Sequence, residues 1–298
     1  MKKNRIIFAL SAVSLALLTA CGDNETLSPY EGEEPVRNEK SIPQGDHDYD
    51  AVIMDWHRRY NVLPLYIFDD RDYYWSVTGD IRWYYDAGQD RTMAGYTVEP
   101  ADQEYVGQLL ELVEQKIFKY FPDETLAKLL PMKILLASRI VHNPGSFHGE
   151  VPESDYIYEN CLSGYDYVCF SGALPKIENM GATDRNQYKK DGVQMILEKA
   201  ITAGTIRADD AFYAISDYDG TYNSATCLQA GLLNEYVSTE SYDLRTYVNL
   251  IVSTPYEQIR AGYLNKYSLV KEKYEIVVNS FMEKYNIDLQ AIGNDVEK

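Results

Sequence analysis

His142, His148 and Glu150 are the residues of this chain whose types and spacing could bind a metal ion. The two histidines bracket the turn sequence NPGSF, and the glutamate follows closely. A zinc site takes about four ligands, often imidazole and carboxylate groups, and no third histidine lies near these two. Because Asn, Pro and Gly mark an exposed turn, we interpret both histidines as loop residues. A metal site at His142, His148 and Glu150 is kept as a weaker alternative.

A second group of oxygen-bearing side chains lies in the segment SDYDGTYNSAT, residues 216–226. Asp217, Asp219 and Asn223 surround Gly220, and a calcium loop takes oxygen ligands at alternating positions around such a glycine. No glutamate stands where an EF-hand loop would end. Asp, Asn and Gly are also the ordinary residues of turns, so we predict an Asx-rich loop here.

The cysteines do not have the spacing of a metal or redox site. Cys161, Cys169 and Cys227 lie in the main part of the chain, and no CxxC or Cys/His pattern occurs. Cys161 and Cys169 could close a small loop by a disulfide. The pairing of the three is left open, and we expect no catalytic role for any of them.

The N-terminus has the three parts of a lipoprotein signal peptide over residues 1–20. Lys2, Lys3 and Arg5 precede the apolar run IIFALSAVSLALL, and LTAC ends at Cys21. The apolar run is shorter than the roughly 20 residues that a membrane span needs. Cys21 is therefore predicted to be lipidated and to hold the protein to a membrane through lipid alone.

The residues after Cys21 indicate where the protein is displayed. The acidic sequence GDNE resembles the surface-export signal of Bacteroides-type lipoproteins, which predicts an outer-membrane lipoprotein exposed at the cell surface. Residues 21–48 are polar and rich in Pro, Gly and acids, so they predict a flexible stalk. The remaining residues, 49–298, are enough for one large domain.

Charge excludes one class of partner. The formal net charge is −18, and the acids are spread along the chain, so no basic face for nucleic acid is expected. No glycine-rich phosphate loop or GxSxG motif occurs. The expected partners are a membrane, through the lipid, and an unknown protein, peptide or glycan.

Periodicity predicts strands in the first half of the chain and helices in the second, which is an α+β domain. Strands are predicted over 62–68, 80–86, 132–141 and 166–173, and helices over 48–61, 98–122, 187–203 and 254–287. The segment 242–252 is a helix or a strand by periodicity alone.

Taken in order, these segments resemble a family of lipoproteins from Bacteroides-type bacteria described as zinc-binding metallopeptidases. The resemblance covers about residues 49–292. It rests on the order and spacing of the segments NVLPLYIFDD…DIRWYYD, VEPADQEYVGQLLELVEQKIF, LPMKILLASRIV, CFSGALPKIENMGATDRN, DDAFYAIS, AGLLNEYVSTESYDLRTYVNLIVSTPYEQI and KYEIVVNSFMEKYNIDL. It implies a zincin-like fold with a mixed N-terminal sheet, packed helices and a helical C-terminal half. It also implies a zinc cofactor and peptidase activity.

The family's defining motif, HExxH on a helix, is missing from this chain. The sequence DGVQM stands in its place, so that Asp191 and Met195 replace the two histidines and Gly192 replaces the glutamate. The downstream acidic ligand falls near Thr246, and no histidine occurs after His148. These residues predict no zinc and no catalytic residues at this position.

We therefore predict a surface-tethered binding or accessory protein that resembles zinc metallopeptidases without their activity. The family's genes often lie beside glycan-uptake systems, which suggests the same setting here. One alternative is a peptidase with a rearranged metal site. Another is a glycan-binding lipoprotein that uses the aromatic residues YYW (73–75) and RWYY (82–85).

Overall fold

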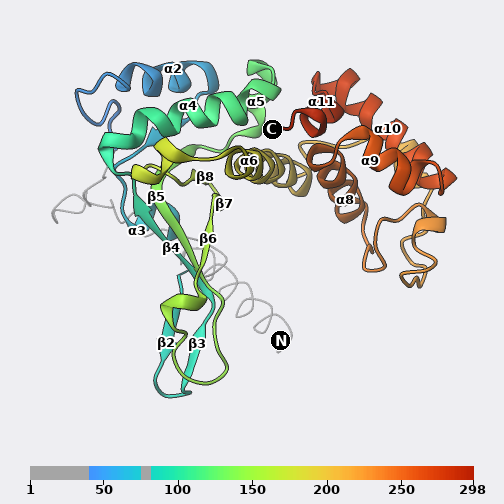
Figure 1. The fold of residues 1–298 in the computed structure, drawn as a ribbon, viewed down its shortest axis with the longest axis horizontal. Helices are drawn as coiled ribbons and strands as arrows, with labels where there is room; N and C mark the ends of the chain where they lie inside the picture. The colour runs from blue at the N-terminus through green and yellow to red at the C-terminus, as the bar shows by residue number, and fades with distance from the viewer. Residues whose placement is uncertain (1–39, 75–81) are drawn as a thin grey trace, which may run out of the picture. The chain divides into compact units, whose positions relative to one another are not determined.

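The long strand β5 (Lys133–Asn143) is the centre of a six-stranded mixed sheet (Figure 1). It pairs parallel with β1 (Leu63–Leu65) and β8 (Tyr167–Phe170), antiparallel with β4 (Gly95–Pro100) and β6 (Ile157–Glu159), and β7 (Cys161–Ser163) pairs antiparallel with β8. Residues 134–137, ILLA, are fully buried because both faces of β5 are covered. This confirms the central strand predicted over 132–141.

The structure is a computed structural model that describes residues 40–74 and 82–298. Contacts separate Ser41–Lys298 from the preceding unit. The predicted signal peptide, Cys21 and residues 21–39 of the predicted stalk lie outside the described residues. Within the described ranges, no helix is both long enough and apolar enough to cross a membrane.

Helices cover the sheet and form the whole second half of the domain. They are α2 (Asp50–Tyr60), α3 (Asp70–Tyr74), α4 (Val106–Lys116), α5 (Asp123–Leu129), α6 (Ala182–Thr202), α7 (Asp210–Ala214), α8 (Glu240–Ser253), α9 (Tyr256–Ile259), α10 (Ser268–Tyr285) and α11 (Leu289–Asn294). A π-helical segment, Arg260–Leu264, follows α9. Mixed strands followed by helices confirm the predicted α+β class and settle 242–252 as helix.

The main core continues among α7, α8, α10 and α11 in the helical half, and it begins between one face of the sheet and the helices α2, α4, α5 and α6. Trp56, Phe118 and Phe170 meet there with ring centroids 4.7 and 5.9 Å apart. A smaller core, which includes Leu135 and Cys169, covers the other face. Burial of these large side chains stabilises the packing of sheet and helices.

Helix α6 connects the sheet to the helical half of the domain. It contacts β7 on one side and α8 on another, as predicted for a helix near 187–203 packed on the sheet of 132–141. Tyr188, Val193, Ile196 and Leu197 form its buried side. Asp184, an acid in the first turn, stabilises the helix by interacting with the positive end of the helix dipole.

Three predicted boundaries differ from the structure. The start of the predicted helix 98–122 is strand β4, because residues 95–100 pair with β5 before α4 begins at Val106. The predicted strand 80–86 is reduced to β2 (Tyr84–Asp86), which forms a hairpin with β3 (Arg91–Met93). Residues 41–48, placed in the stalk, lie on the domain, where Gln44 Oε1 accepts from the backbone of Tyr66 at 2.7 Å.

Cys161 and Cys169, whose pairing the sequence left open, do not form a disulfide. Their strands pair antiparallel, with Cys161 opposite Phe170 and Cys169 opposite Leu162. Paired residues share a face of the sheet and neighbours alternate, so the two thiols lie on opposite faces. Both are free, and burial raises the pKa of each thiol. Cys169 and Cys227 are buried, and Cys161 packs partly buried against the main core, so none of the three is placed as a reactive thiol.

Candidate functional site

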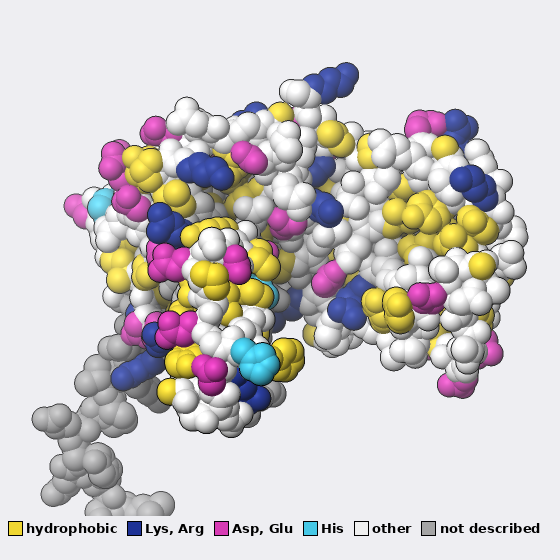
Figure 2. All heavy atoms as spheres, turned by 60° about the horizontal axis from the view of Figure 1, so that its bottom comes forward, with side chains coloured by type: hydrophobic (Ala, Val, Ile, Leu, Met, Phe, Trp, Pro, Cys, Tyr) yellow, Lys and Arg dark blue, Asp and Glu magenta, His cyan; other side chains and the backbone are white. Residues whose placement is uncertain are grey.

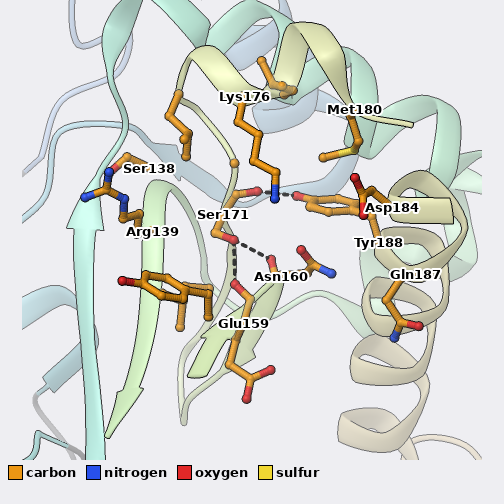
Figure 3. A pocket seen from close by; sticks show the side chains of 15 residues that line it. Ser138, Arg139, Glu159, Asn160, Ser171, Lys176, Met180, Asp184, Gln187 and Tyr188 are labelled. Atoms are coloured by element: carbon orange, nitrogen blue, oxygen red, sulfur yellow. Dashed lines mark hydrogen bonds between the residues drawn. The ribbon is translucent and has the colours of Figure 1, made fainter. Parts of the chain in front are cut away.

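A cavity of about 520 Å³ opens between the sheet and the first turns of α6 (Figure 3). Fifteen residues from β5, β6, the 171–180 loop and α6 line it: Ser138, Arg139, Ile140, Tyr158, Glu159, Asn160, Ser171, Gly172, Leu174, Lys176, Ile177, Met180, Asp184, Gln187 and Tyr188. A cavity of this volume can hold a small molecule or one unit of an oligomeric ligand. We take it as the candidate site.

Hydrogen bonds fix one wall of the cavity. Ser171 Oγ donates to the Glu159 carbonyl at 2.7 Å, and Tyr188 OH donates to the Ser171 carbonyl at 2.9 Å (Figure 3). Burial raises the pKa of Tyr188, so it stays a neutral donor. Gly172 has φ +117°, a conformation that L side chains rarely adopt, which lets the chain turn along this wall.

Asp191 holds two amides that line the cavity. Its Oδ2 accepts from Asn160 Nδ2 at 2.8 Å, and its Oδ1 accepts from Gln187 Nε2 at 2.6 Å. Charged acceptors make strong hydrogen bonds, and the carboxylate also fixes which end of each amide is the nitrogen. Each amide keeps its carbonyl oxygen and a second N–H, for which the described residues supply no partner. The cavity therefore offers two oriented acceptors and two donors.

The remaining polar groups of the cavity are of both signs. Arg139 is paired with Glu99 at 3.5 Å, while Lys176, Glu159 and Asp184 also line the walls. Basic and acidic side chains are also interspersed on the face shown in Figure 2. The Tyr158 ring is 67% exposed. Such a mixed lining suits a neutral, polar ligand with an apolar face better than an anion.

The residues predicted from the resemblance to stand in place of HExxH are placed unfavourably for zinc. A Cβ on Gly192 would lie 2.1 Å from Ile117 Cδ1 and 2.7 Å from its Cγ1. Residue 192, which the resemblance assigns to the general base, therefore faces the packed core, where a larger side chain would clash with Ile117. Glycine at 192 is explained by the close approach of α6 to Ile117.

The other residues at the predicted ligand positions already have partners. Asp191 binds two amides, Met195 packs partly buried against the main core, and Thr246 Oγ1 donates to the Asp243 carbonyl at 2.7 Å. Gln194 donates to the Asn249 carbonyl of α8, so it does not line the cavity. A thioether and a hydroxyl are poor zinc ligands, and one carboxylate does not complete a site. The residues do not fit zinc.

The weaker metal alternative does not assemble either. His142 stacks on Tyr96 across the β4–β5 pair at 4.6 Å, while His148 and Glu150 lie in the exposed turn. Across residues 40–74 and 82–298, no three His, Cys, Asp or Glu side chains are grouped so that they could hold a metal ion.

The Asx loop and the aromatic segments also have structural partners. Asn223 Oδ1 accepts from the backbone of Ala225 and Thr226, as in a capped turn. Tyr73 is buried, and Trp75 lies outside the described residues. Trp83 meets Tyr156 at 54° between ring planes, so these rings do not form a flat platform.

Sequence reasoning missed Asn160, Gln187 and Ser171. The spacing of Gln187 and Asp191, one helical turn apart, could have indicated their contact. Nothing local marks Asn160, which approaches Asp191 because β7, which begins at the next residue, lies beside α6.

Comparison with known proteins gives one distant likeness. Neither a protein-family model nor a curated protein sequence matches the chain. A solved structure of a "putative zinc-binding metallo-peptidase" from Bacteroides caccae matches with 11% sequence identity and a TM-score of 0.45. The match covers 81% of this chain and 87% of that one. It is a distant structural resemblance, and membership of a family does not follow from it.

Proposed function

We propose that this chain is a lipid-anchored binding protein that captures a neutral, polar ligand in the cavity beside α6. In this proposal it uses neither zinc nor peptidase chemistry. The observation that carries the proposal is the contact of Asp191 with Asn160 and Gln187. It pre-orients two cavity amides before any ligand arrives, which lowers the entropy lost on binding.

The ligand class follows from what two amides can recognise. Each presents one donor and one acceptor, which match the hydroxyl pairs of a sugar or the N–H and C=O of a peptide backbone. Ile140, Leu174, Ile177 and Met180 supply an apolar surface beside these amides.

Binding assays with immobilised neutral oligosaccharides and end-blocked peptides would test the proposal. Replacing Gln187 with Leu removes one amide, and we expect binding to weaken about tenfold, the effect of one lost hydrogen bond. Gln194→Leu is the matched control, because Gln194 lies on the same helix but turns to α8. Equal loss in both variants would contradict binding in the cavity.

Zinc content and lipidation test the rest. Protein purified without a metal-affinity resin should contain no stoichiometric zinc and should cleave no peptide. One zinc per chain, with peptidase activity lost to a chelator, would overturn the proposal.

Cys21→Ser should release the protein from membranes; unchanged membrane fractionation would contradict lipid anchoring at the outer-membrane surface.

A further inference from the structure

A lysine and an aspartate lie sealed together in the helical half of the domain. Lys273 of α10 contacts Asp243 of α8 through Nζ and Oδ2, and both side chains have 0% exposure. The rings of Phe212, Tyr247 and Tyr218 surround the Nζ atom, with centroids at 4.3, 5.3 and 5.9 Å. Among the ion pairs of residues 40–74 and 82–298, no other has both side chains fully buried.

The hydrogen-bond partners of this pair fit a neutral amide better than an ion pair. Asp243 Oδ1 is buried without a partner, although each oxygen of a buried carboxylate is an acceptor that needs a hydrogen-bond donor. The three N–H bonds of the ammonium meet two acceptors in the described residues, Ser216 Oγ at 2.8 Å and Asp243 Oδ2. Tyr218 OH donates to Oδ2 at 2.8 Å.

A secondary amide would use each of these partners once. Its N–H would donate to Ser216 Oγ, and its carbonyl oxygen, the former Oδ2, would accept from Tyr218 OH. The atom with no partner, Oδ1, would leave the site as water. A buried ion pair, in contrast, often stabilises a protein no better than apolar residues of the same size.

We propose that Lys273 and Asp243 condense after folding into an intramolecular isopeptide bond between α10 and α8. A proton first passes from the ammonium to the carboxylate, where Oδ1 holds it, which gives a neutral amine and a carboxylic acid. Nζ then attacks Cγ, while Tyr218 donates to Oδ2 as that oxygen gains charge. The Cγ–Oδ1 bond breaks, Oδ1 takes a second proton from Nζ, and one water leaves. Nothing is oxidised or reduced, and no co-reactant is needed.

Burial favours the reactive forms of both groups. Desolvation lowers the pKa of Lys273 and raises that of Asp243, in each case by disfavouring the charged form. Holding the two groups in contact replaces a bimolecular encounter with an intramolecular one. The neighbouring titratable groups facing the pair are Tyr218 and Tyr247, and burial raises the pKa of both, so they remain protonated donors.

The test is the mass of the full chain compared with that of a Lys273→Met variant. The wild type should be lighter than its sequence requires by one water molecule, relative to the variant, so any lipid attached to both cancels. A tryptic digest should contain one branched peptide that joins the segments around Asp243 and Lys273.

Each other result overturns the inference. A wild-type mass with no deficit means an unreacted ion pair, and this measurement does not depend on how well the variant folds. A deficit that persists in Lys273→Met places the loss of water elsewhere, as does a digest with separate peptides.

Discussion

Asp191 and Asp243 lie on neighbouring helices that pack together, yet their surroundings assign them opposite roles. Asp191 is half-buried at the cavity, where it accepts from two neutral amides and positions them. Asp243 is sealed among aromatic rings with an amine, where burial raises its pKa. Access to water, rather than residue type, decides which aspartate orients a binding site and which becomes part of the core.

The largest expected effect on stability is at the buried pair of Asp243 and Lys273. Lys273→Met leaves a fully buried carboxyl group without the lysine that it contacts and, as proposed above, is joined to, which should lower the free energy of unfolding by at least about 3–5 kcal/mol. Lys271→Met on the same helix breaks only an exposed pair with Glu275 and should cost less than about 0.5 kcal/mol. Denaturant unfolding of both variants measures the difference. Equal costs would show that the interior of this half is not closed to water.

The next effect concerns the packed side of α6. Gly192→Ala places a methyl group against Ile117, and overpacking should cost about 1–3 kcal/mol despite the better helix propensity of alanine. Gly107→Ala in α4 meets only ordinary contacts at 3.9 Å and should be neutral or stabilising by up to about 1 kcal/mol. Thermal unfolding decides between them. A stabilising Gly192→Ala would mean that the position could hold a larger residue, and would reopen the fit to zinc.

These residues show what the sequence can and cannot predict. The apolar run of β5 and the periodicity around Val193, Ile196 and Leu197 predict the central strand and α6, because burial imposes both patterns. The absence of histidine after His148 predicts that the HExxH motif of the resembled family is missing, and this stays a prediction. The contacts of Asn160 with Asp191 and of Asp243 with Lys273 join residues about thirty positions apart. Such pairs depend on how elements pack, which no local pattern records.

A smaller effect on stability is expected at Asp191, beside the cavity. Asp191→Ala should change stability by about 1 kcal/mol or less, since its side chain is half-buried and its partners can turn to water. The side-chain amide signals of Asn160 and Gln187 should shift in ¹H–¹⁵N spectra and exchange faster with water. Asn249 Nδ2, which contacts Glu198, is the internal reference and should not move. Unchanged Asn160 and Gln187 signals would remove Asp191 from its positioning role.

The smallest effect tests a third aspartate that is more exposed than the other two. Hydrogen bonds from Lys119 and then Tyr120 lower the pKa of Asp295 from 3.8 to about 2. A carboxyl with a lowered folded-state pKa contributes stability above its unfolded value, and loses it as the pH falls from about 4 toward about 2. Because the pair is 42% and 46% exposed, the contribution should stay below about 1 kcal/mol. Asp295→Asn should therefore be slightly less stable than the wild type near neutral pH and equal to it below about pH 2. A difference that persists in acid would mean that the loss comes from packing of the C-terminal segment. In that case the effects of the three aspartates on stability would not follow from their exposure to water, as those of Asp191 and Asp243 suggest.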